Sequence, residues 1–287
     1  MRQRIITGFF FTLGVFLFVI PSFWIPEIII PFALIVGAVA FHEMKKALNA
    51  GGIKPSTGLL VTGGIMPAVL LAVSILLGFD IFKSIALFAV VQGLICLSAA
   101  VIPSIYIKTG EGLTSGVATA LIIFYITFPL YCLCAGMILV PHGWYYMVCG
   151  LFASWISDVC AYFVGVTMGK HKIVPHISPK KTWEGCVGGA VGCALIVMLY
   201  FDFVVYPMDE LKINIVLFSI IMFVLGFVIS CLSQIGDWLA SLVKRKVGIK
   251  DYGNIFPGHG GMMDRFDSSF FTIPTGLLIA LIALLFF

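Results

Sequence analysis

The sequence contains few charged residues. Asp, Glu, Lys and Arg make up only 10% of its 287 residues, whereas 61% are apolar, and the mean hydropathy is +1.14. Soluble domains carry roughly 25% charged residues. The hydrophobic core of a soluble domain cannot use this much apolar surface, so the composition excludes a soluble globular protein. It predicts an all-α, polytopic membrane protein that forms a bundle of transmembrane helices.

Several motifs are also missing. The eight cysteines include no Cys-x-x-Cys pair and show no ligand spacing with the histidines, which argues against a zinc site. No Gly-x-x-x-x-Gly-Lys-Ser/Thr sequence occurs, so the chain has no P-loop. We find no low-complexity tract and no convincing internal repeat.

Apolar segments divide the chain into about nine predicted spans, most of them near the ~20 residues that cross the hydrocarbon core. The first two are separated only by Pro21–Pro26 and could form one broken segment. We expect residues 1–140 to form N-terminal transmembrane helices and residues 141–287 a catalytic half with cytoplasmic loops at 169–185 and 236–268. The segments lie at 5–21, 24–41, 58–78, 83–103, 113–140, 143–168, 186–206, 212–234 and 269–287.

The positions of the basic residues predict the orientation. With nine spans and a cytoplasmic N-terminus, only Lys83 and Lys212 of the 17 Lys and Arg residues lie outside, which leaves 17 − 2 = 15 inside. The positive-inside rule favours this topology. Arg2 and Arg4 precede an apolar run without a small-residue cleavage site, so we expect a retained anchor.

Asp158 is an acid within a predicted span. Such a residue costs about 2.5–3.5 kcal/mol at a helix centre, and it usually faces the bundle interior or a watery cavity. Tyr162 shares its helix face, and Gly165 and Gly169 extend that face as a small-xxx-small pattern, which lets another helix approach closely. The alternative is a buried aspartate that is hydrogen-bonded for packing alone.

The loop at 169–185 carries four lysines around a Ser/Thr-containing turn. Ser178, Lys180 and Lys181 suit phosphate, because ammonium groups and exposed backbone N–H groups both point at anions. Thr182 could cap the next helix. The alternative is that these lysines only set the topology.

The longest polar stretch joins the last two predicted spans. On a helix, Asp237 and Ser241 share one stripe with Lys244 and Arg245. Several glycines follow, so the backbone can bend tightly and approach a ligand. Asp264 and Asp267 would share a face on a helix beginning near Met262. Two such carboxylates suggest Mg²⁺ or Mn²⁺ between them; the alternative is a pair of acids that favour the helix dipole.

The segment SLVKRKVGIKDYGNIFPGHGGMMDRFD, residues 241–267, resembles the signature of the phosphatidate cytidylyltransferase (CDP-diacylglycerol synthase) family. The segments ISPKKTWEG (177–185) and SDVCAYFVG (157–165) are also similar to family blocks, although Val159 stands where threonine is common. The N-terminal half matches only in hydropathy and length. The fixed positions of the signature are all met, by Ser241, Lys244, Arg245, Lys250, Asp251, His259, Gly260, Gly261, Asp264, Arg265 and Asp267.

The resemblance implies a nucleotidyltransferase that converts CTP and phosphatidate to CDP-diacylglycerol and pyrophosphate in membrane phospholipid biosynthesis. It implies that Asp237, Asp264 and Asp267 bind Mg²⁺ or Mn²⁺, with one or two cations left open. Lys244, Arg245, Lys250 and Arg265 would take phosphate oxygens, and Ser178, Lys180 and Lys181 would help to close the CTP site. His259 would donate to a phosphate or serve as a turn residue, and Asp158 could line the cavity and orient a basic partner. The remaining candidates for substrate binding are Ser241, Asp251, Gly260 and Gly261.

Other classes fit less well. A secondary transporter should show repeats and mid-membrane ionisable residues in broken helices, whereas here we expect only Asp158 to lie deep in a span. The Asp-Gly-x-x-Ala-Arg pattern of CDP-alcohol phosphotransferases is absent. We expect a multi-pass protein of a bacterial plasma membrane with its active site on the cytoplasmic side. Its expected partners are CTP, phosphatidate and the bilayer; no nucleic acid is expected, and a homodimer is left open.

Overall fold

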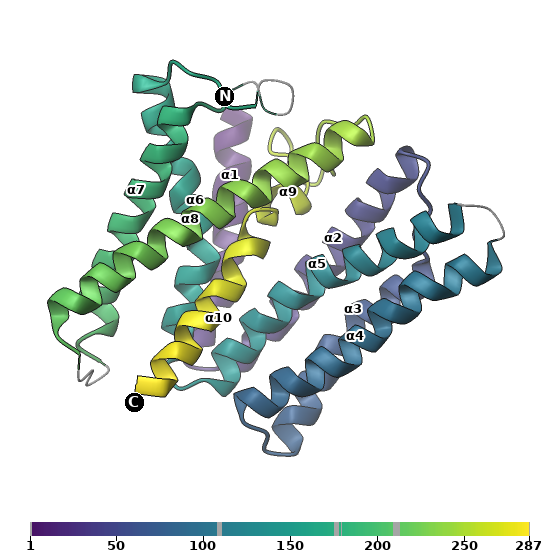
Figure 1. Ribbon diagram of the computed structural model, residues 1–287, viewed down its shortest axis with the longest axis horizontal. Helices are drawn as coiled ribbons and strands as arrows, with labels where there is room; N and C mark the ends of the chain where they lie inside the picture. Colours follow the sequence, from purple (N-terminus) through teal and green to yellow (C-terminus); the bar gives the residue numbers. More distant parts are fainter. Residues whose placement is uncertain (1, 108–110, 175–177, 179, 209–212, 287) are drawn as a thin grey trace. The chain divides into compact units, whose positions relative to one another are not determined.

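The computed structural model describes residues 2–107, 111–174, 178, 180–208 and 213–286, and the described residues form helices without a strand (Figure 1). The α-helices are α1 (Arg2–Val19), α2 (Ile29–Ala50), α3 (Thr57–Leu76), α4 (Ile81–Tyr106), α5 (Glu111–Leu139), α6 (Gly143–Met168), α7 (Trp183–Tyr200), α8 (Ile215–Lys246), α9 (Met263–Phe266) and α10 (Ser269–Phe286). Two 3₁₀ turns, η1 (Pro21–Phe23) and η2 (Pro26–Ile28), join α1 to α2, and a π-helical turn, η3 (Phe201–Val205), follows α7.

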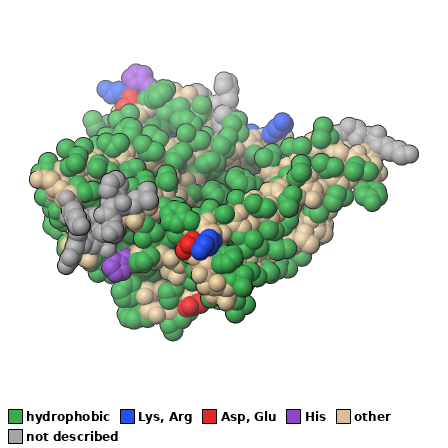
Figure 2. Space-filling model, turned by 60° about the horizontal axis from the view of Figure 1, so that its bottom comes forward, with side chains coloured by type: hydrophobic (Ala, Val, Ile, Leu, Met, Phe, Trp, Pro, Cys, Tyr) green, Lys and Arg blue, Asp and Glu red, His purple; other side chains and the backbone are tan. Residues whose placement is uncertain are grey.

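The membrane prediction is confirmed. In the described ranges, eight helices are long and apolar enough to cross a membrane, and α10 is a shorter apolar helix. The first two predicted segments are separate helices, because two prolines break the chain between them. Figure 2 shows a face made mostly of hydrophobic side chains, as expected for contact with lipid.

Two helices extend beyond the predicted apolar segments. Helix α2 continues to Ala50 and α8 to Lys246, because their polar ends keep an amphipathic pattern. In α2, the last turns still bury Glu43, Met44 and Ala47. Polar residues near the end of each helix are therefore held on rigid helix rather than on loop.

The described chain clusters into two compact units. Unit 1 comprises Met1–Trp144 with Lys244–Phe266, and unit 2 comprises Tyr145–Val243 with Asp267–Phe287. Helix α8 thus contributes most of its length to unit 2 and its last turn to unit 1. The functional division predicted at residue 140 stays a prediction.

Helix α5 is the central element of unit 1, where it packs against α2, α3 and α4 (Figure 1). A Cβ at Gly116 would lie 2.3 Å from the Ala100 carbonyl oxygen, so only glycine lets α4 come this close. Buried hydroxyl groups join the helices: Ser84 Oγ lies 2.6 Å from the Tyr131 hydroxyl and donates to Ser74 Oγ at 2.8 Å. At the far end, the backbone N–H of Lys83 donates to Asp80 at 2.8 Å and lowers the pKa of that N-capping carboxyl.

Unit 2 is organised around α6. Its Ser157 Oγ lies 2.6 Å from Ser230 Oγ of α8, and its Ser154 Oγ lies 2.7 Å from Ser269 Oγ of α10. A Cβ at Gly189 of α7 would lie 2.8 Å from the Ala161 Cβ, and one at Gly165 would lie 3.3 Å from Thr182 Oγ1. The predicted close approach of a second helix at the α6 glycines is confirmed, and α7 is that helix.

The α6–α7 contact predicts a specific loss of stability. We expect Gly189→Leu to lower the free energy of unfolding by about 1–3 kcal/mol, because the added side chain has no space against α6. Thermal unfolding in detergent measures the effect. Gly93→Leu is the matched control, since a Cβ at Gly93 meets nothing within 4 Å; equal losses in both variants would contradict the close packing.

Candidate active site

The Asp264 carboxylate is the centre of the polar cluster in unit 1. Its Oδ1 accepts a hydrogen bond from Lys244 Nζ at 2.9 Å, and its Oδ2 accepts from the backbone N–H groups of Tyr252 at 2.8 Å and Gly261 at 3.0 Å. The Lys244 and Asp264 side chains are only 11% and 4% exposed. A buried charge needs an opposite charge and filled hydrogen bonds, and Asp264 has both.

Two glycine turns shape the signature loop, which we define as residues 247–262 between α8 and α9. Gly248, at φ 76°, ends α8, and the Ile249 N–H donates to the Lys244 carbonyl at 2.9 Å. Gly260, at φ 82°, lies against Asp264, where a Cβ would be 2.8 Å from Oδ2. The predicted tight bends at the glycines are therefore present around this carboxylate; the predicted approach of the backbone to a ligand stays a prediction.

Glu43 of α2 holds the same loop from its other side. Its two carboxylate oxygens accept the backbone N–H groups of Met262 at 3.1 Å and Met263 at 2.8 Å, and the residue is only 3% exposed. A Cβ at Gly253 or Gly261 would overlap the carboxyl group. Glu43 therefore caps α9 from a different helix and leaves room only for glycine beside it.

Sequence reasoning missed Glu43, which follows the predicted span 24–41. The reasoning applied above to Asp158, that an acid within an apolar helix is costly and therefore notable, also applies to Glu43. Glu43 is an acid in the continuation of an apolar helix. Only the fold shows that its partners are residues more than two hundred positions away, at Met262 and Met263.

The other signature residues of unit 1 surround this cluster. Arg245, Lys250 and Asp251 are exposed, and the Arg245 guanidinium donates to the Ile249 carbonyl at 3.5 Å. The His259 ring packs against α1, where a Cβ at Gly8 would lie 3.6 Å from it. Arg265 is half-buried on α9. Of the basic residues of the signature, Lys244 contacts the Asp264 carboxylate directly, and Arg245 and Lys250 are exposed.

A second lysine–aspartate pair lies in unit 2. Lys181 forms an ion pair with Asp237 of α8, and its ammonium lies 5.6 Å from the centre of the Trp238 ring. Ser241 Oγ donates to Asp237 Oδ1 at 3.5 Å. The loop at 169–185 is therefore in contact with α8, through the ion pair of Lys181 with Asp237. Lys180 is exposed, and Ser178 is half-buried and makes a backbone turn with Lys181.

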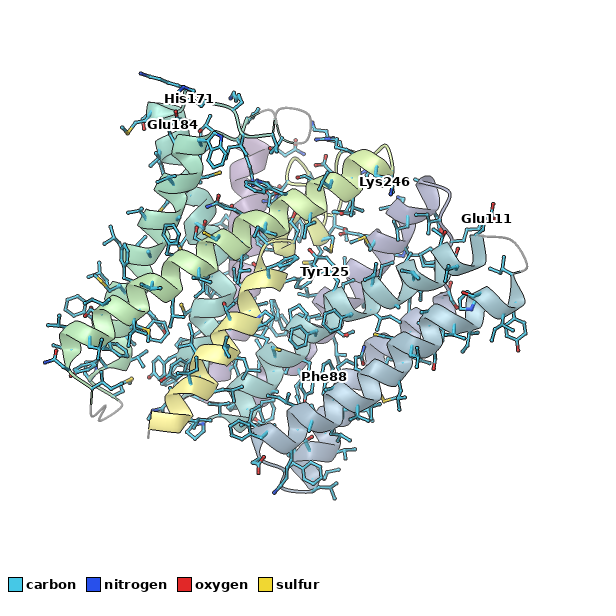
Figure 3. The ribbon with its side chains drawn as sticks, viewed as in Figure 1. Phe88, Glu111, Tyr125, His171, Glu184 and Lys246 are labelled. Carbon is cyan, nitrogen blue, oxygen red and sulfur yellow. The ribbon has the colours of Figure 1, made fainter. Side chains whose placement is uncertain are left out.

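Glu184 organises the same loop and was also missed. It accepts backbone hydrogen bonds from Lys170 at 3.1 Å and His171 at 3.2 Å, and its carboxylate lies 2.6 Å from His171 Nδ1 (Figure 3). The predicted cap at Thr182 is confirmed, because the Gly185 N–H donates to its hydroxyl at 3.2 Å. Glu184 thus joins the backbone at Lys170 and His171 to the first turn of α7.

Two acids differ from expectation. Asp158 lies on an exposed face of α6, beside an exposed Tyr162, and not in the interior of its unit. The helix expected to carry both Asp264 and Asp267 ends at Phe266, and Asp267 lies in the following turn, where its Oδ1 accepts from the Ser268 N–H at 2.7 Å. Over the ranges that the structure describes, no three His, Cys, Asp or Glu side chains gather as metal ligands, so the three-aspartate site stays a prediction.

Comparison with known proteins bears on the whole chain. A model of the cytidylyltransferase family matches residues 2–283. The chain belongs to this family. It is 42% identical over 137 residues to the phosphatidate cytidylyltransferase of Staphylococcus saprophyticus, which covers 46% of this chain and 48% of the relative. It is 42% identical over 132 residues to the enzyme of the same name from Staphylococcus haemolyticus, covering 46% and 47%. The matched stretch spans about half the length of each curated relative.

The Glu43 contact predicts how this family member holds its signature loop. We expect Glu43→Ala to raise amide hydrogen exchange at Met262–Phe266, because two buried N–H groups lose their acceptor at a cost of about 1–3 kcal/mol. Hydrogen-exchange mass spectrometry of the full chain measures it. Glu27→Ala removes an exposed acid that precedes α2 and is the control; unchanged exchange in Glu43→Ala would show that the loop is held by other contacts.

Proposed function

We propose that this protein transfers CMP from CTP to phosphatidate, giving CDP-diacylglycerol and pyrophosphate. The observation that carries the proposal is the signature loop, which closes on the buried Lys244–Asp264 pair. Arg245, in the last turn of α8, and Lys250, in the loop, are exposed beside it in the sequence. Family membership and relatives named phosphatidate cytidylyltransferase support it. An anionic nucleotide and an anionic lipid both suit such a basic cluster at a membrane boundary.

The reaction needs charge neutralisation more than covalent catalysis. A phosphate oxygen of phosphatidate attacks the α-phosphorus of CTP, the bond between the α-phosphorus and the bridging oxygen breaks, and pyrophosphate leaves with that oxygen. Both reactants are anions, so the protein must position them and offset their repulsion. Lys244, Arg245, Lys250 and Arg265 would hold phosphate oxygens, and no nucleophilic side chain is required.

We further propose nucleotide contacts for residues of the second polar cluster. We assign Lys180 and Lys181 to triphosphate oxygens and Ser178 to the loop that covers them. The Lys181 ammonium also lies over the Trp238 ring, a cation–π contact. His259 would donate to a phosphate or shape its turn, and Asp158 would orient a basic partner from α6.

A divalent cation fits the chemistry of the acidic residues. Asp237, Asp264 and Asp267 would hold Mg²⁺ or Mn²⁺, since both ions prefer carboxylate oxygens. Asp264 and Asp237 each form an ion pair with one ammonium group, from Lys244 and Lys181, so a metal ion would have to take the place of these lysines. When bound, the ion would offset triphosphate charge; one or two ions remain equally compatible with these donors.

The arrangement within unit 1 supports a cytoplasmic site. The Gly8 region of α1, the Glu43 end of α2 and the signature loop contact one another at one end of the unit. The basic residues at this end of α1 and α2 and in the signature loop are ones that the positive-inside rule places in the cytoplasm, where CTP is found. We propose the inner membrane of a bacterium as the location; a homodimer stays a prediction.

The activity test uses membranes or liposomes that contain the full chain. We expect labelled CTP and phosphatidate to yield CDP-diacylglycerol only with Mg²⁺ or Mn²⁺. Asp264→Asn should lower turnover at least about 100-fold, because it removes a negative charge from the reaction centre. Asp80→Asn is the matched control, since asparagine caps the start of α4 as well as aspartate does.

The outcome is decisive only for folded protein, so each variant is also checked by thermal unfolding. Absence of product from the well-folded native chain would contradict the proposed activity. Near-normal turnover by Asp264→Asn would remove that carboxylate from the reaction and leave it a structural partner of Lys244.

Orientation is tested separately by cysteine labelling in whole cells. Asn49→Cys at the end of α2 should react with a membrane-impermeant maleimide only after permeabilisation, and Leu77→Cys beyond α3 should react in intact cells. Both positions are exposed, and the native chain reports background labelling. The reverse pattern would overturn the orientation.

A further inference from the structure

Unit 1 contains a large cavity that the proposed chemistry does not use. It has a volume of about 400 Å³, within the ~300–1,000 Å³ of ligand sites, and lies between α2, α3 and α5. Small residues create the space: Gly37, Ala38, Gly64 and Ala68 line it. A Cβ at Gly64 would already lie 2.9 Å from the Phe41 ring.

The cavity is apolar along most of its length. Its deeper polar side chains are satisfied inside the protein, since Thr127 accepts from Gln92 at 2.9 Å and the Tyr131 hydroxyl lies 2.6 Å from Ser84 Oγ. Its outer walls include Leu34, Val61 and Ile65, which are 44–54% exposed. In a bilayer these residues meet acyl chains, so the cavity is accessible to a lipid tail.

Positive charge lies at one end. His42, Lys45 and Thr57 line the cavity where α2 ends and α3 begins, and Lys45 Nζ donates to Thr57 Oγ1. The lining runs along α2 from Ile30 to Lys45, about 22 Å at 1.5 Å per residue. An elongated apolar site with one basic end complements a phospholipid with an anionic headgroup.

The basic end adjoins the signature loop through α2. Glu43, between His42 and Lys45 in the sequence, accepts the N–H groups of Met262 and Met263. One face of α2 therefore lines the cavity while another holds the loop. The headgroup of a lipid in the cavity would lie beside α2, the helix that holds the signature loop. This location suits the lipid substrate of the reaction better than a lipid of the bulk bilayer.

We propose that the α2–α3–α5 cavity binds an acyl chain of phosphatidate, with Lys45 and His42 facing its phosphate. This inference rests on the proposed function for the identity of the lipid. It adds a tail-binding site, and it makes α2 the element that joins tail recognition to the signature loop.

The binding test needs no turnover. The full chain in phosphatidylcholine liposomes is irradiated, without CTP, in the presence of phosphatidate that carries a diazirine in its acyl chain, and labelled residues are mapped by mass spectrometry. Phosphatidylcholine with the same diazirine chain is the matched probe. We expect phosphatidate to label the cavity lining several-fold more strongly. Equal labelling by both probes, or labelling elsewhere, would overturn the proposal and indicate a site for bulk lipid.

A kinetic test uses Ala68→Phe to fill the cavity and Ala72→Phe, one turn further along α3 and outside the lining, as control. Ala68→Phe should raise KM for long-chain phosphatidate by about tenfold, the effect of losing roughly two buried methylene groups. KM for CTP and for a short-chain phosphatidate should stay unchanged. An unchanged long-chain KM overturns the proposal.

Ala68→Phe could fail to fold, and turnover of short-chain phosphatidate would then also be lost. Lys45→Gln tests the proposal in that case. Lys45→Gln should reduce the labelling preference for phosphatidate over phosphatidylcholine, and an unchanged preference counts against the site. Absence of product from the native chain overturns the proposed function instead, and phosphatidate-selective labelling would remain a finding of its own.

Discussion

A carboxylate beside hydrocarbon is stable only when the protein itself supplies its partners, and this constraint governs the signature loop. Asp264 receives a lysine ammonium and two backbone N–H groups, and Glu43 receives two more N–H groups from the start of α9. Leaving such a group unsatisfied would cost several kcal/mol near the membrane interior. The glycines of the loop follow from the same requirement, because Gly253, Gly260 and Gly261 lie where a side chain would displace one of these two carboxylates.

Charge pairing links stability to the proposed chemistry. Two ion pairs join residues with proposed roles in binding substrate or metal. They are Lys244–Asp264 in unit 1 and Lys181–Asp237 in unit 2. Removing one partner of a buried pair leaves an uncompensated charge. A variant at these positions therefore tests folding and reaction together, and a stability measurement must accompany each activity measurement. Arg245 and Lys250 are exposed, so their effects on turnover are easier to interpret.

Helix α2 has two faces with different tasks. Glu43 and its buried neighbours face the signature loop and the unit 1 core, whereas Ala38, Phe41 and Lys45 line the apolar cavity. The helix can serve both because it continues as regular, rigid helix to Ala50, beyond the apolar stretch. Small side chains on its cavity face keep space open, and the single acid on its other face fixes the loop. One helix can thus position both the proposed lipid site and the signature loop.

Composition and order of residues determined the membrane class, the approximate helix positions and the polar signature, because hydropathy and local spacing act along the chain. They also predicted the Thr182 cap and the close approach at the α6 glycines, which depend on neighbouring residues or on helical period. Tertiary structure alone decided which distant groups meet: Glu43 with Met262 and Met263, Lys181 with Asp237, and the walls of the cavity. It also ended α9 at Phe266 and turned Asp158 outward. Such contacts depend on how helices pack, and packing is set by side chains that are far apart in the sequence.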